Sequence, residues 1–225
     1  MTRTNVLAGV LALVGTAALA QSQVASDAWR DLASGNTRFV EGRLAAKRST
    51  LVESQAPPVA VLGCADSRVP PEVVFDKSLG DLFVVRNAGN TPDKIAIGSL
   101  EYAVEHLHTK TIVVLGHMSC GAVAAACSGE KPETANLEAV VAPIAPSCAA
   151  ARHGGSVDLA AAVKDHVHRS ALALVANSTI LKQAMAHGDL TIIEAVYELD
   201  SGRVVPLRSE PNNATASALP RRGPS

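Results

Sequence analysis

The stretch VAVLGCADSR at residues 59–68 decides the fold, together with TIVVLGHMSCG at residues 111–121. In each stretch a run of apolar, mostly β-branched residues ends in side chains that can bind a metal ion. Short apolar runs of this kind are typical of buried strands. Both predicted strands therefore end in ligand-forming residues, and ligands bind at that edge of an open α/β sheet.

The composition indicates a globular chain with an aliphatic core. The 225 residues are 48% hydrophobic but only 3% aromatic, so the core must be built from Ala, Val, Leu and Ile. This length suits one domain with appendages. The formal net charge is −1 and no block of like charges stands out, which argues against nucleic-acid partners and a polybasic membrane surface.

Residues 1–20 have the pattern of a secretory signal peptide. Arg3 precedes an apolar stretch over residues 6–19, and Ala18-Leu19-Ala20 forms a cleavage site. The stretch is shorter than the ~20 residues of a membrane span, which favours cleavage after Ala20 over a retained anchor. We therefore expect an exported protein, periplasmic or secreted, with no membrane association after cleavage.

The rest of the chain predicts an α/β fold. Strands are expected over residues 58–64, 82–86, 111–116 and 191–199, with helices between them. This order implies a mostly parallel central sheet of four strands, flanked by helices. The turn Asp200-Ser201-Gly202 adds an antiparallel edge strand.

The domain is expected to span residues 21–208 and to begin with a helical arm. Apolar residues at helical spacing predict an amphipathic helix over residues 24–44. This helix either covers its own sheet or reaches across to a neighbouring subunit. Residues 209–225 are rich in Pro, Asn, Ala, Ser and Arg without periodicity, which indicates a disordered tail.

Local signals predict where several helices begin. A helix is expected after Thr91, with Pro92 in its first position, and a long one after Ser156, running to about Ala176. Ser178 is expected to cap the next helix. Residues 129–155 are punctuated by prolines and glycines and are predicted to be irregular.

Cys64, His117 and Cys120 are candidate zinc ligands. Two thiolates and an imidazole make three of four tetrahedral ligands, and three protein ligands with an open position are typical of catalytic zinc. His117 and Cys120 are three residues apart, so a turn that enters a helix can direct both to one ion. Spacing alone also allows two buried thiols and an ordinary strand-end histidine.

Asp66 and Arg68 form a candidate dyad next to these ligands. The planar guanidinium of Arg pairs well with a carboxylate. Held in this way, Asp66 could accept a hydrogen bond from zinc-bound water, or it could swing onto the metal as a fourth ligand in a closed state. The plain alternative is a surface ion pair.

The motifs Cys64-x-Asp66-Ser67-Arg68 and His117-x-x-Cys120 together resemble those of the β-class carbonic anhydrases. The resemblance extends from about residue 27 to residue 208. Further matching segments are Gln55, residues 83–90, residues 99–104 and residues 195–202.

The resemblance implies a zinc-dependent carbonic anhydrase, a lyase that hydrates CO₂ reversibly to bicarbonate and a proton. It implies one Zn²⁺ per subunit on Cys64, His117 and Cys120, and attack by zinc-bound hydroxide oriented by the catalytic pair Asp66 and Arg68. It also implies a homodimer or a higher homo-oligomer. The substrate pocket would be built across the dimer interface from Gln55, Phe83, Tyr102 and Gly121.

Two alternative functions and one cysteine pair stay open at this point. The same scaffold hosts carbon disulfide and carbonyl sulfide hydrolases, and the motif also allows a non-catalytic zinc-binding or thiol-redox module. Cys127 and Cys148 match no zinc position. In an exported protein they form either a disulfide or two separate buried thiols.

Overall fold

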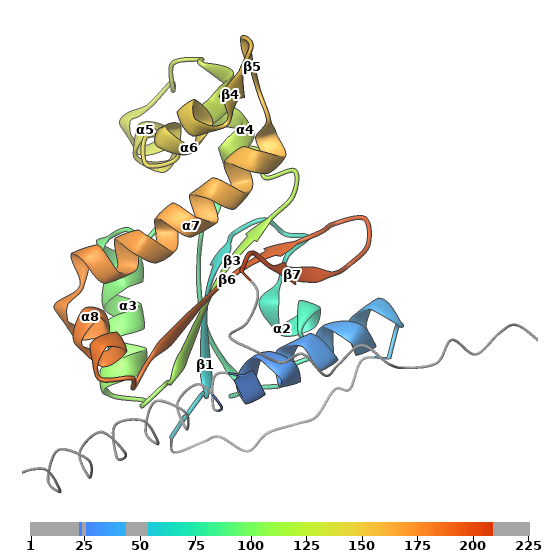
Figure 1. Ribbon diagram of the computed structural model, residues 1–225, viewed down its shortest axis with the longest axis vertical. Coiled ribbons are helices and arrows are strands. Elements are labelled where there is room, and N and C mark those ends of the chain that lie inside the picture. The colour runs from blue at the N-terminus through green and yellow to red at the C-terminus, as the bar shows by residue number, and fades with distance from the viewer. Residues whose placement is uncertain (1–22, 24–25, 44–53, 209–225) are drawn as a thin grey trace, which may run out of the picture.

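The computed structural model describes residues 23, 26–43 and 54–208. The predicted signal peptide at residues 1–20 and the predicted tail at residues 209–225 lie outside the described residues. At the centre of the described part lies a five-stranded sheet with helices on both faces (Figure 1).

The sheet has the strand order β2-β1-β3-β6-β7. Its strands are β1 (Val59–Cys64), β2 (Leu82–Asn87), β3 (Thr111–His117), β6 (Thr191–Tyr197) and β7 (Val204–Pro206). The first four run parallel, whereas β7 pairs antiparallel with β6. The predicted fold class is therefore confirmed.

The central strands owe their position to their apolar sequence. Every residue of β1 and β3 is buried, as expected for a parallel strand covered by helices on both faces. The alternation of side chains divides β1 between two clusters, with Ala60 and Leu62 on one face and Val59 and Val61 on the other. The edge strand β2 is only partly buried.

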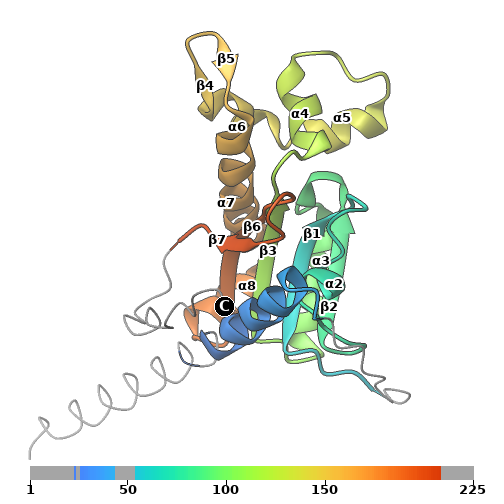
Figure 2. The same cartoon turned by 90° about the vertical axis from the view of Figure 1, so that its right-hand side faces the viewer.

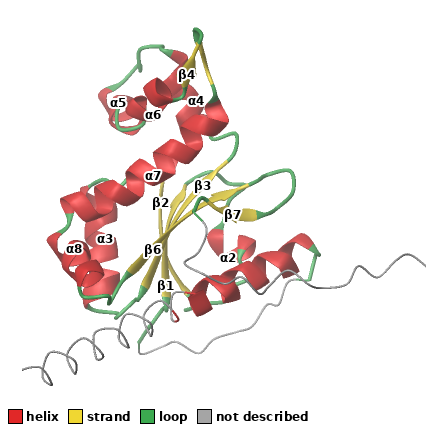
Figure 3. Ribbon diagram, viewed as in Figure 1, coloured by secondary structure: helices red, strands yellow, loops and turns green. Residues whose placement is uncertain are grey.

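Helices form a layer on each face of the sheet (Figures 1 and 3). On one face lie α3 (Lys94–Glu105), α7 (Leu159–Asn177) and α8 (Thr179–Ala186). On the other face lie the short α2 (Pro71–Val74) and the helix over residues 26–40. In Figure 2 the helix over residues 26–40, drawn in blue, lies in front of the strands.

The helix over residues 26–40 covers the sheet of its own chain. Trp29 and Leu32 are buried in the second cluster. The Asn36 side chain donates to the carbonyl of Gly202 at 2.6 Å and accepts from the amide of Val204 at 2.9 Å. Of the two predicted placements of this helix, the one over its own sheet is confirmed. Its predicted ends at Val24 and Leu44 lie outside the described residues.

The start of α3 differs from the prediction. Asp93, not Thr91, caps this helix, because the Asp93 carboxylate accepts from the amide of Ala96 at 2.7 Å. The amide of Thr91 is instead bonded to the side chain of Asn87 at 2.8 Å. A carboxylate cap is favoured both by its hydrogen bond and by its charge at the positive end of the helix dipole.

The start of α7 is corrected in the same way. Asp158, not Ser156, caps this helix by accepting from the amides of Ala160 and Ala161. Ser156 lies in a short strand. The predicted cap of α8 is confirmed, because Ser178 Oγ accepts from the amide of Leu181 at 3.0 Å.

The segment after β3 is more ordered than predicted. It contains α4 (Gly121–Ser128), α5 (Ala135–Val141), α6 (Ala145–Ala150) and the hairpin of β4 (Arg152–His153) with β5 (Ser156–Val157). The prolines that suggested a loop fall between the helices or in a first helical turn, where proline is tolerated. These elements lie together beyond one end of the sheet (Figures 1 and 2). No helix among the described residues is both long and apolar enough to cross a membrane.

A disulfide joins Cys127 on α4 to Cys148 on α6. Of the two states that the sequence left open, the bonded one is confirmed. Cys148 is buried and Cys127 packs against the same core cluster. The bond therefore fastens α6 to the helix that begins at a predicted metal ligand.

Removal of this disulfide should destabilise the fold. We expect the Cys127→Ala/Cys148→Ala variant to lose about 3 kcal/mol in free energy of unfolding, since the bond closes a loop of roughly 20 residues in the unfolded chain. For a domain of this size, that loss lowers the Tm by about 6–12 °C. Circular dichroism melts in zinc-containing buffer measure the difference.

Reductant provides the matched control for this prediction. It should lower the Tm of the native chain and leave that of the double variant unchanged. Equal melting temperatures for the two non-reduced proteins would show that the bond adds no stability.

Candidate metal centre

The three predicted ligands meet where β1 and β3 end. Cys64 is the last residue of β1, His117 is the last residue of β3, and Cys120 directly precedes α4. Their ligand atoms all lie within 4.8 Å of one another, and the sulfurs of Cys64 and Cys120 are 4.0 Å apart. All three side chains are buried. The structure therefore brings together side chains that are up to 56 residues apart in sequence.

The tautomer of His117 leaves one nitrogen free for a metal. His117 Nδ1 lies 3.0 Å from the carbonyl of Met118. Because a carbonyl can only accept, Nδ1 carries a hydrogen, and Nε2 is the nitrogen through which His117 can bind a metal. Nε2 is buried without a hydrogen-bond partner among the described residues. This arrangement is typical of metal-binding histidines, whose second nitrogen is fixed by a backbone carbonyl.

The geometry of the donor set fits zinc. Tetrahedral coordination with Zn–S bonds of about 2.3 Å places two sulfurs about 3.8 Å apart. The observed separation of the Cys64 and Cys120 sulfurs is 4.0 Å. Two thiols and an imidazole are also the donor chemistry that zinc prefers.

The two thiols share a hydrogen bond that separates their pKa values. The bond with Cys120 lowers the pKa of Cys64, against the effect of burial. The bond with Cys64, together with burial, raises the pKa of Cys120. Of the two thiols, Cys64 is therefore the one that loses its proton more readily.

Asp66 and Arg68 form the predicted pair beside these ligands. Arg68 donates from Nε to Asp66 Oδ1 at 2.9 Å and from Nη2 to Oδ2 at 2.6 Å. Asp66 Oδ2 lies 3.8 Å from His117 Nε2. The hydrogen bonds from Arg68 hold the pKa of Asp66 well below its usual range, so this carboxyl group is ionised.

Arg86 binds the backbone of the same loop. This role was not predicted from the sequence. Arg86 donates from Nε to the carbonyl of Cys64 at 2.8 Å and from Nη2 to the carbonyl of Asp66 at 2.6 Å. The signal that could have indicated this role is a charged residue at the end of a predicted strand, next to the predicted metal ligands. Sequence reasoning also missed the contact of Gly89 with Cys64 and that of His166 with Gly89.

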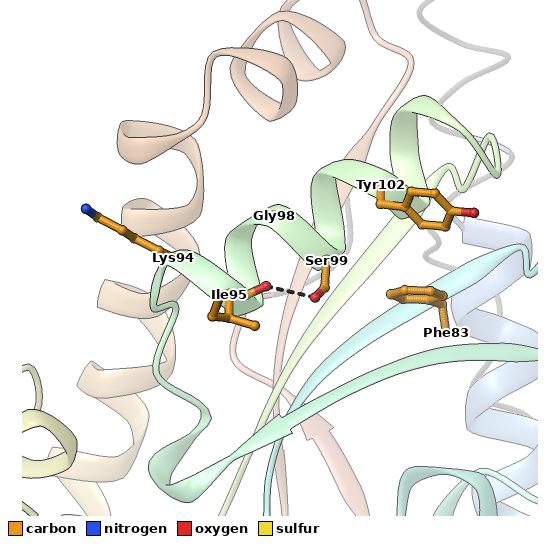
Figure 4. Close-up of a pocket in the computed structure, with 6 residues that line it drawn as sticks. All are labelled: Phe83, Lys94, Ile95, Gly98, Ser99 and Tyr102. Atoms are coloured by element: carbon orange, nitrogen blue, oxygen red, sulfur yellow. Dashed lines mark hydrogen bonds between the residues drawn. The ribbon is translucent and has the colours of Figure 1, made fainter. Parts of the chain in front are cut away.

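Phe83 and Tyr102 lie on a different part of the surface. They line a hollow of about 400 Å³ on α3 and β2, with their rings 6.4 Å apart (Figure 4). Phe83 pairs in register with Ala60, four residues before Cys64, which places it about 13 Å along the strands from Cys64. Within one chain these two aromatic residues are therefore remote from the metal ligands.

Gln55 and Gly121 also take different positions. Gln55 is exposed before the start of β1, at the opposite end of that strand from Cys64. Gly121 is the first residue of α4 and directly follows Cys120. Of the four predicted pocket residues, one chain brings only Gly121 to the metal ligands.

Comparison with known proteins places the fold and the site in a family. Residues 59–204 match the family model described as carbonic anhydrase. The chain is 42% identical to carbonic anhydrase 2 of Mycobacterium tuberculosis over 187 residues, which cover 79% of this chain and 90% of that one. It is also similar to the solved β-carbonic anhydrase of Coccomyxa, with 30% identity and a TM-score of 0.64, over 81% of this chain and 83% of that one. This chain belongs to the β-carbonic anhydrase family.

Other members of the β-carbonic anhydrase family show the same likeness. The carbonic anhydrase of Mycolicibacterium smegmatis is 40% identical over 79% of this chain and 90% of its own length. A tetrameric β-carbonic anhydrase of Sordaria macrospora has a TM-score of 0.62 and 26% identity, covering 81% of this chain and 92% of that one. The resemblance inferred from the sequence motifs is confirmed.

Proposed function

We propose that this β-carbonic anhydrase is a zinc enzyme that hydrates CO₂ reversibly to bicarbonate and a proton. The observation that carries the proposal is the position of the Asp66–Arg68 pair, whose carboxylate lies 3.8 Å from His117 Nε2. A structural zinc site is closed by four ligands and has no use for an ionised pair at a fourth position. The non-catalytic alternative leaves this pair unexplained.

Cys64, His117 and Cys120 would hold the zinc ion. Bound zinc lowers the pKa of water to near neutrality and so supplies hydroxide at physiological pH. The chain keeps the donor atoms fixed and shielded from solvent. Arg86 serves this purpose by binding the backbone on both sides of Ala65.

Asp66 would orient the attacking water molecule. Because this carboxyl group is ionised, it can only accept hydrogen bonds. A water molecule that donates to Asp66 has its lone pair directed elsewhere, toward CO₂. The alternative, in which Asp66 becomes a fourth ligand, requires its oxygens to leave the two hydrogen bonds from the Arg68 side chain. That cost favours the arrangement in which Asp66 stands beside the water.

Stopped-flow assays of CO₂ hydration with a pH indicator test this function. The zinc-loaded native chain should be active between pH 7 and 9. Asp66→Ala should keep its zinc but lose activity about 10²-fold or more, because the orienting acceptor is gone. Metal analysis of each protein measures the zinc content.

Cys120→Ser is the control for metal binding, because it should lose both zinc and activity. Carbonyl sulfide, offered as an alternative substrate, tests the rival hydrolase function. Absence of CO₂ hydration by the zinc-loaded native chain would contradict the proposal. Full activity of Asp66→Ala would remove Asp66 from the mechanism.

We further propose that the enzyme is a homodimer that pairs across the face formed by β2 and α3. The edge strand β2 pairs with β1 alone among the described residues. Ile95 is 79% exposed and Tyr102 is 47% exposed, and both line the hollow on this face. A second copy of the chain would cover these apolar side chains.

The position of the pocket residues supports this arrangement. A two-fold axis perpendicular to β2 reverses the strand direction in the partner. The end of β2 that carries Phe83 in one subunit then lies beside the opposite end of β2 in the other subunit. That opposite end is next to the end of β1 where the metal ligands lie. Such an interface would bring Gln55, Phe83 and Tyr102 toward the partner's metal site and complete a pocket with Gly121. An apolar pocket suits CO₂, which has no charge to bind.

Ile95→Lys should weaken this dimer, because it places a charge in an apolar interface. Light scattering after size-exclusion chromatography should give the mass of one chain for this variant, and of two chains or a multiple for the native protein. Leu172→Lys is the matched control, since Leu172 is 56% exposed on α7. An unchanged mass for Ile95→Lys would contradict this interface.

We also infer that the protein is exported. The pattern of residues 1–20 supports this inference, and so does the disulfide between Cys127 and Cys148, because disulfides persist in oxidising compartments.

Mass spectrometry tests export directly. When the full sequence is expressed in a bacterial host, the periplasmic protein should begin at Gln21. A cytoplasmic protein that still begins at Met1 would contradict the inference.

A further inference from the structure

Gly89 connects the metal site to the helix layer. It lies in the short turn η1 (Ala88–Asn90) that follows β2, is buried, and has a φ of +76°. Its amide nitrogen lies 3.3 Å from the sulfur of Cys64, so it donates a hydrogen bond to that sulfur. The orientation of the Ala88–Gly89 peptide, which carries this N–H, therefore affects the predicted zinc ligand Cys64.

A hydrogen bond to a thiolate changes how much electron density the sulfur donates to a metal. An N–H donor withdraws electron density from the sulfur, and the sulfur then donates less charge to a bound ion. Partners of this kind, one step outside the ligands, orient the ligands and tune the metal. The donor must itself be held in place, because a glycine with positive φ has much conformational freedom.

His166 on α7 holds the other side of Gly89. Its Nε2 lies 2.7 Å from the carbonyl oxygen of Gly89, across 77 residues of sequence. A carbonyl can only accept, so Nε2 carries the hydrogen and donates it. His166 is 2% exposed, and this burial lowers its pKa, which favours the neutral imidazole.

Packing leaves no room for a side chain at residue 89. A Cβ at this position would lie 2.8 Å from Ile144 Cδ1 and 3.2 Å from the Cβ of Ala122. Ile144 is fully buried at the start of α6, which the disulfide fastens to α4. Residue 89 must therefore be a glycine, and this glycine makes one hydrogen bond through its amide and one through its carbonyl.

We propose that His166 is a positioning residue of the metal site, which holds the Gly89 amide on the sulfur of Cys64 by donating from Nε2 to the Gly89 carbonyl. This inference rests on the proposed function only in taking Cys64 as a metal ligand. Without the donor at residue 166, the Gly89 carbonyl loses its buried partner, and the backbone of Gly89 is no longer fixed between its two peptide units. Because glycine tolerates many backbone angles, the Ala88–Gly89 peptide, which carries the N–H, can then rotate away from Cys64. The sulfur of Cys64 then loses its hydrogen bond.

Variants at residue 166 separate the hydrogen bond from the volume of the side chain. His166→Met is of similar size and has no donor, whereas the amide of His166→Gln reaches about as far as Nε2 and can donate. We expect His166→Met to bind zinc about 10–100-fold more weakly, as is typical when such a partner is lost. His166→Gln should recover most of the affinity. Competition with a chromogenic chelator measures the dissociation constants.

The cobalt-substituted protein gives a readout that a packing defect would not produce. The charge-transfer absorption from thiolate to cobalt moves to lower energy when a thiolate loses a hydrogen bond. We therefore expect a red shift in His166→Met and a native band in His166→Gln. His168→Met is the matched control, because this neighbour on the same helix contacts Glu194 instead of Gly89.

The outcomes distinguish this inference from the proposed function. An unshifted band in His166→Met, or the same loss of affinity in the Met and Gln variants, would overturn the role of His166 and leave the metal site standing. Absence of a thiolate–cobalt band in the native chain would instead overturn the metal site. If His166→Met does not fold, His166→Asn gives the same contrast with His166→Gln, because its amide is one bond shorter.

Discussion

The parallel register between β1 and β3 is the constraint on which the rest of the site depends. Gly63 pairs with Leu115, so β1 and β3 end within two residues of each other at one edge of the sheet. Cys64 and His117 can therefore direct their ligand atoms to one point. A slip of one residue would turn every side chain of a strand to the opposite face and separate these ligands. The continuous apolar sequence of both strands resists such a slip, because both faces are buried.

The fold and the ligands could be predicted because their signals are local. The apolar runs before Cys64 and His117 mark the strands, and the ligand types follow directly in the sequence. Helix starts were harder, since Thr91 and Asp93 both suit an N-cap and the choice depends on Asn87, which binds the Thr91 amide. The interactions that were missed join distant segments. Nothing near His166 in the sequence indicates that its imidazole contacts Gly89, because only the packing of α7 on the sheet brings them together.

The site combines buried polar groups with few partners of their own. His117 Nε2 has no hydrogen-bond partner among the described residues, and an unsatisfied buried nitrogen costs about 1–3 kcal/mol. The sulfurs of Cys64 and Cys120 lie 4.0 Å apart beside this nitrogen. A bound metal ion would satisfy these groups together, so metal binding and folding stability are coupled in such a site. The donor set therefore makes more physical sense as a binding site than as a section of core.

The helices beyond the sheet connect the disulfide to the same site. Cys120 directly precedes α4, and Cys127 near the other end of that helix is bonded to Cys148 on α6. At the start of α6, Ile144 packs against Gly89, whose amide lies on the sulfur of Cys64. A covalent bond remote from the ligands thus restrains one ligand through α4 and another through Ile144 and Gly89. An oxidising environment, which maintains this bond, also maintains the enclosure of the metal site.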